Sequence, residues 1–86
     1  MTLLEDIRGA TEPMVRIGDT VSWRGGFGMD PARPARVVGI TVTEEPRSKY
    51  GATAQEAPWS LVRANRVLFD LDTGNWAYGE QIQPAR

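Results

Sequence analysis

Residues 66–79 restrict the fold of this chain more than any other segment, because they predict two strands joined by a tight turn. Val67, Phe69 and Leu71 alternate with other residues and therefore share one face of a strand. The Asp-Thr-Gly that follows, residues 72–74, is typical of a type I turn with glycine in the left-handed conformation. A β-hairpin near the end of a short chain predicts a small all-β barrel, a fold that more often binds than catalyses.

The length favours one small domain, and the composition lacks histidine and cysteine. The chain has 86 residues, which suits a single domain. We expect residues 1–14 to be a lead-in or short helix and residues 15–86 to be the barrel. Cysteine and histidine are both absent, so disulfides, cysteine zinc sites and the commonest general base are excluded. We therefore expect no cofactor and no enzymatic activity.

The charge of the chain argues against a dedicated nucleic-acid binder. Its 10 basic and 11 acidic residues give a net charge of −1, whereas such domains usually have a pI above about 9. The first residues carry neither a basic region nor a long apolar run, so we expect no signal peptide and no membrane span. These features predict a cytoplasmic protein.

Alternating apolar residues predict further strands before the hairpin. Residues 15–23 contain two short alternating runs separated by a Gly-Asp turn. In residues 36–43, Val38, Ile40 and Val42 are expected on one face, with a bulge or bend at Gly39. The predicted core comprises Val21, Val38, Ile40, Val67, Phe69 and Leu71.

The segments between these strands predict loops and one helical insertion. Residues 24–34 contain three glycines and two prolines and are expected to form a long loop. Residues 44–57 are polar and predict a second excursion. Residues 58–65 favour one or two helical turns that begin at a proline and end at a left-handed asparagine. A 3₁₀-like turn at residues 79–82 and a short last strand complete a five-stranded antiparallel barrel.

This order of elements resembles an SH3-like barrel. Residues 17–21 (Ile-Gly-Asp-Thr-Val) are similar to the opening of many such barrels, including KOW and Tudor-type modules. Four stretches together resemble a group of small uncharacterised bacterial and phage proteins with this fold: residues 18–28, 49–51, 58–59 and 76–82. The resemblance implies the barrel fold over roughly residues 15–84 and carries no activity and no site residues.

Two motifs suggest catalysis or metal binding but have simpler structural explanations. Asp72-Thr73-Gly74 matches the triplet of retroviral-type aspartic proteases. That fold needs more chain after the motif than the 12 residues present here, and a hairpin turn explains the same triplet. Asp70 and Asp72 lie on one strand, but two carboxylates without further ligands are a poor metal site.

The candidate binding residues are aromatic and arginine side chains. The segment around Phe27 either contacts RNA through its glycine-rich loop or folds back onto the core. The other aromatic residues belong either to the core or a subunit interface, or to a ligand groove. The arginines either contact phosphates or acidic peptides or are ordinary surface charges. The full set is Trp23, Arg24, Phe27, Arg33, Arg36, Trp59, Trp76 and Tyr78.

These features predict a non-enzymatic interaction module that binds a protein partner, assembles with itself, or does both. A homodimer that buries Trp59 or Trp76 is one form of that prediction. The alternative is a nucleic-acid-binding module that uses the arginine-containing loop 24–36. The arginines at positions 24, 33, 36 and 47 distinguish these functions, because one shared basic face favours nucleic acid and interrupting acids favour a protein.

Overall fold

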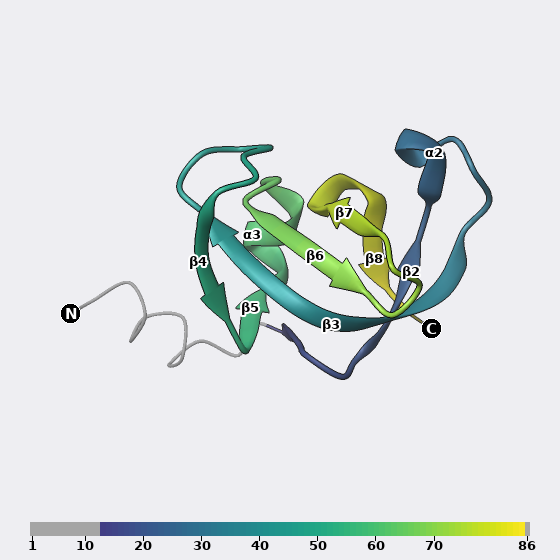
Figure 1. Cartoon of the computed structure of the whole chain (residues 1–86), viewed down its shortest axis with the longest axis horizontal. Helices are drawn as coiled ribbons and strands as arrows, with labels where there is room; N and C mark the ends of the chain where they lie inside the picture. Colours follow the sequence, from purple (N-terminus) through teal and green to yellow (C-terminus); the bar gives the residue numbers. More distant parts are fainter. Residues whose placement is uncertain (1–12, 86) are drawn as a thin grey trace.

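The computed structural model describes residues 13–85, with the exception of the Phe27 side chain (Figure 1). The short helix predicted within the lead-in therefore lies outside the described residues. The described chain forms an antiparallel β structure with short helical turns. Its elements are β1 (Met14–Arg16), β2 (Thr20–Trp23), α2 (Gly25–Gly28), β3 (Arg33–Thr43), β4 (Gly51–Ala54), β5 (Glu56–Pro58), α3 (Trp59–Arg63), β6 (Val67–Leu71), β7 (Trp76–Tyr78), η1 (Gly79–Gln81) and β8 (Ile82–Pro84).

Most strands belong to one sheet with the order β7-β6-β3-β2-β8, and β4 also pairs with β3. β1 and β5 form a separate two-stranded sheet. Every pairing is antiparallel, as predicted. The five strands of the main path match the five expected from the sequence. The short β1 pairs with β5 rather than with its neighbour β2.

The polar excursion predicted over residues 44–57 contains two strands, so that prediction was incomplete. β4 consists of Gly-Ala-Thr-Ala and pairs with the second half of β3. Small residues without an apolar alternation give no strand signal, and the long free side of β3 supplies the hydrogen bonds that order them. The predicted loop over residues 24–34 is also partly regular, because α2 forms one helical turn and β3 already begins at Arg33.

The long strand β3 connects the two halves of the sheet and carries the predicted bulge. It pairs with β2 along its first residues and with β6 further on, and the register shifts between Val37 and Gly39. The shift reverses which residues face inward: Val37 is fully buried, whereas Val38 is 51% exposed. The assignment of Val38 to the core was therefore wrong, because strict alternation was extended across the bulge.

The β6–β7 hairpin has the predicted turn. Gly74 has a φ of 86°, and its N–H donates to the carbonyl oxygen of Leu71 at 3.0 Å. Asp72 accepts a hydrogen bond from the backbone N–H of Arg36 at 3.0 Å. This bond ties the turn to β3 and gives Asp72 a structural role. The Asp-Thr-Gly triplet is thus part of a hairpin turn.

The core lies between the bent sheet and α3. Among the predicted core residues, Val21, Ile40, Val67, Phe69 and Leu71 are all buried. The turn at Asn65 has the predicted left-handed conformation, with a φ of 59°. Helix α3 contributes Trp59 and Val62, which lie three residues apart and therefore on one face of the helix. The helical insertion thus completes the core beside β6.

Candidate functional site

A surface groove of about 310 Å³ lies between α2, the β6–β7 turn and η1. Its floor and walls combine aromatic rings with glycine backbone and two amide side chains. We call it the aromatic groove, and it is lined by Trp23, Gly25, Gly26, Gly74, Asn75, Trp76, Tyr78 and Gln81. A volume of this size is at the lower end for small-ligand sites, which span about 300–1,000 Å³, and suits one or two side chains of a peptide.

Alternation along β7 presents two aromatic side chains to this groove. Ala77 is fully buried against the core, so its neighbours Trp76 and Tyr78 point to the other face of the strand. Trp76 is 47% exposed. The two rings meet edge to face, with centroids 5.3 Å apart and an interplanar angle of 88°. An edge-to-face pair has a defined geometry, so the hairpin presents an ordered apolar surface.

The third aromatic residue of the groove, Trp23, ends β2 and is only 8% exposed. Its indole Nε1 is buried and finds no acceptor among the described residues. A Cβ added to Gly25 would lie 3.2 Å from the Cζ2 atom of Trp23, so the glycine allows α2 to pack against the indole. An unpaired buried donor costs about 1–3 kcal/mol.

Three cations stack on the three aromatic rings. The Arg33 guanidinium lies 5.9 Å from the centroid of Trp23, and the Lys49 ammonium lies 5.0 Å from that of Trp76. The Arg47 guanidinium lies 5.1 Å from the centroid of Tyr78. These distances are within the range of cation–π attraction. Because the protein's own cations already cover these ring faces, the groove is a poor cage for an external cation.

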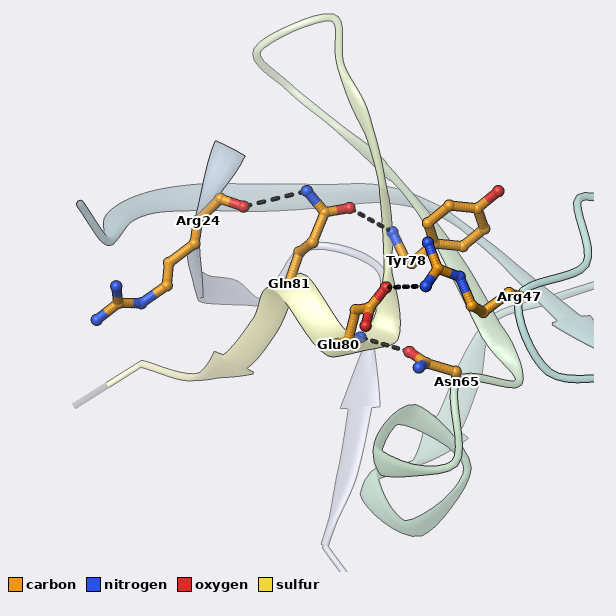
Figure 2. A network of polar contacts seen from close by, with 6 residues as sticks. All are labelled: Arg24, Arg47, Asn65, Tyr78, Glu80 and Gln81. Atoms are coloured by element: carbon orange, nitrogen blue, oxygen red, sulfur yellow. Dashed lines mark hydrogen bonds and ion pairs between the residues drawn. The ribbon is translucent and has the colours of Figure 1, made fainter. Parts of the chain in front are cut away.

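Gln81 and Glu80 of η1 hold the groove together through polar contacts (Figure 2). The Gln81 amide donates to the Arg24 carbonyl oxygen at 3.1 Å and accepts from the Tyr78 N–H at 3.0 Å. One side chain therefore connects the end of β2 to β7 and fixes Tyr78.

The adjacent Glu80 fixes the other side of η1. Its backbone N–H donates to Asn65 Oδ1 at 2.6 Å, and its carboxylate pairs with Arg47 at 3.2 Å. The loop before β4 is thus tied to η1, and Arg47 is held over Tyr78.

The structure does not bring the predicted arginines onto one face. Alternation along β3 places Arg33 on the side of the buried Ala35, and Arg36 points the opposite way. Arg24 and Arg47 lie on opposite sides of Gln81 (Figure 2), and Glu80 neutralises Arg47. The four arginines therefore do not form a continuous basic face.

Two of the predicted binding residues remain, Trp59 and Phe27. Trp59 is 8% exposed and belongs to the core, so the groove does not include it. The Phe27 side chain lies outside the described part of the structure. Within residues 13–85, Asp70 and Asp72 belong to no cluster of three or more potential metal ligands.

Several residues that shape the groove were not predicted from the sequence as binding residues. Gln81 carried no usable signal: its side chain accepts from the Tyr78 N–H, but the capping-box pattern requires Ser or Thr at the position that Tyr78 occupies. The sequence marked Arg47 as a possible member of a basic face, but it did not indicate that Arg47 or Lys49 contacts an aromatic ring, because that contact depends on how loop 44–50 folds over β7.

Comparison of the chain with protein-family models, curated proteins and solved structures gives no match. The resemblance to small bacterial and phage proteins therefore remains a prediction. None of the helices in residues 13–85 has the length and apolar character that crossing a membrane requires.

Proposed function

We propose that this chain is an SH3-like barrel that acts as a non-enzymatic protein-interaction module. The strand order of the main sheet supports that fold, because β2, the first strand of this sheet along the chain, lies between β3 and the last strand β8. So does the position of η1, a 3₁₀ turn immediately before β8. In this proposal, an extended segment of a partner protein lies in the aromatic groove.

The observation that carries the proposal is the exposure of Trp76 beside the partly buried Tyr78. Large aromatic side chains bury well in a small core, yet Trp76 leaves almost half of its surface in water. Aromatic residues on a rigid strand are typical anchors of protein interfaces, because they bury a large area and lose little conformational entropy.

The lining of the groove supports binding rather than catalysis. Indole, phenol, amide and backbone groups line it in the described residues, and none of them is a carboxylate or an amine. General acid–base chemistry uses histidine, carboxylates, lysine or an activated phenol or thiol. Tyr78 is the single titratable side chain among the lining residues, and one phenol gives no acid–base pair.

A second copy of the chain is the other protein partner that the sequence predicts. Trp59 is covered within its own chain, so of these two tryptophans Trp76 is the one that self-association would cover. Sedimentation at micromolar concentration distinguishes the two partners. A dimer that Trp76→Ala dissociates identifies a second copy as the occupant, whereas a monomer leaves the groove open to a different protein.

Selection from a phage-displayed library of random peptides tests the proposed function. We expect the wild-type domain to enrich related sequences that no longer bind after Trp76→Ala. Tyr50→Ala is the matched control, because Tyr50 is also an exposed aromatic residue but does not line the groove. Failure to enrich any peptide, or equal binding by the Trp76→Ala variant, would overturn the proposal.

A further inference from the structure

We infer that the segment bound in the aromatic groove is acidic, with carboxylates that pair with Arg33 and Lys49. The inference rests on the proposed function and adds the chemical class of the ligand. Arg33 and Lys49 each stack on a tryptophan that lines the groove. Neither cation is itself a lining residue of the groove, and Arg33 lines a separate hollow with Ser22 and Pro34. A carboxylate on a bound peptide would therefore meet each cation at the edge of the groove, beside its tryptophan.

The charges around the groove are unevenly paired. Glu80 pairs with Arg47, so these two side chains together add no net charge beside the groove. The side chains of Arg24, Arg33 and Lys49 form no ion pair within residues 13–85. The Asp30 carboxylate lies about 3 Å from the Cβ position of Gly26 and is the remaining acid beside α2. Asp70 is a second acid, because it lies opposite Trp76 across the β6–β7 pairing. Three cations without an ion pair against two acids leave a small excess of positive charge beside the groove.

The stacked geometry keeps the hydrogen-bonding groups of these cations available. The Arg33 guanidinium lies 5.9 Å from the Trp23 centroid and forms no ion pair within residues 13–85, so its N–H donors are available to a carboxylate. The ammonium of Lys49 has three donors, and stacking on Trp76 satisfies none of them fully. Stacking also restricts both side chains before binding, which lowers the entropic cost of forming the pairs.

A peptide fits these charges better than a nucleic acid does. A phosphate backbone needs a continuous basic track, because its affinity comes from neutralising successive phosphates. Here Arg36 points away from Arg33, and the whole chain carries a net charge of −1. Two separated cations beside an apolar groove instead match a segment that alternates apolar and acidic residues.

Peptides obtained by the library selection test the inference. The selected sequences should be rich in Asp and Glu. Synthesis of the strongest binder with its acids replaced by Asn and Gln should weaken binding to the wild-type domain by about tenfold in fluorescence anisotropy. Arg33→Gln and Lys49→Gln should each weaken the acidic peptide severalfold but leave the amide peptide unchanged. Arg36→Gln removes the same charge from the opposite face of β3 and is the control.

The possible results separate the inference from the proposed function. Selected peptides that are neutral or basic, or an amide peptide that binds as tightly as the acidic one, would overturn the acidic ligand and leave the interaction module intact. A library without any binder would overturn both. A single-stranded uridine oligonucleotide that binds more tightly than the selected peptide, and depends on Arg33, would replace the peptide by a nucleic acid.

Discussion

The beginning of α3 and the strand β7 each carry a tryptophan, but the two regions use it differently. Trp59 is 8% exposed, whereas Trp76 is 47% exposed. Trp59 begins a short helix whose inward face also includes Val62, so helix packing draws its ring into the core. Strand β7 buries the small Ala77 and leaves Trp76 outside. Stability of the fold therefore accounts for the position of Trp59, whereas the exposure of Trp76 needs a different explanation.

The largest effect is expected from Trp59→Ala. Removing a large buried aromatic side chain leaves a cavity and costs about 3–5 kcal/mol. A small domain has a total stability of about 5–15 kcal/mol, so this variant should lose much of its folded population. Chemical denaturation followed by circular dichroism measures the loss. A denaturation midpoint equal to that of the parent would show that Trp59 is not part of the core, and the two tryptophans would then not differ in their structural role.

A smaller loss is expected from Gly74→Val in the turn that presents β7. Gly74 has a φ of 86°, in the left-handed region that costs other residues about 1–2 kcal/mol. Nothing lies within 4 Å of its Cβ position, so backbone strain is the source of the loss. Gly74→Asn is the control, because asparagine tolerates this conformation better. Equal stability of the parent and the valine variant would contradict the turn.

Trp76→Ala should change stability by less than about 1 kcal/mol, because its ring is half exposed and loses mainly the Lys49 and Tyr78 contacts. The same denaturation experiment as for Trp59→Ala gives a matched pair. A loss as large as that of Trp59→Ala would mean that Trp76 is a structural residue, and the reason to expect a partner there would disappear.

The smallest change is expected from Glu80→Gln. This substitution removes the ion pair with Arg47, whose side chains are 45% and 56% exposed, and exposed pairs contribute about 0–1 kcal/mol. The difference from the parent should shrink as salt is added, because salt screens exposed charges. A salt-independent loss above this range would indicate that the Glu80 side chain has a further structural role.

The sequence predicted the elements whose signals are local. The hairpin turn at Gly74, the left-handed Asn65 and the 3₁₀ turn before β8 follow from residue type and spacing. The inward face of β6 was also predicted, because no bulge interrupts the alternation of Val67, Phe69 and Leu71. Val38 was wrongly assigned to the core. A bulge shifts the inward-facing positions of a strand by one residue, and the pattern of apolar residues does not show where that shift occurs.

The groove was less predictable, because it depends on contacts between distant segments. Trp23, Trp76 and Tyr78 were predicted as candidates, but only the fold separates them from Trp59. The cations from loop 44–50 stack on β7 residues that lie far away in the sequence. No local pattern encodes that contact.

The most direct test uses the three tryptophans of the chain as reporters in one experiment. Their indole N–H groups give separate signals in a nitrogen–proton correlation spectrum, and the strongest selected peptide is added in steps. We predict that the signals of Trp23 and Trp76 shift with the added peptide while that of Trp59 stays in place. A peptide that binds and shifts Trp59 alone, or leaves both groove tryptophans unchanged, would contradict the assignment of the binding surface.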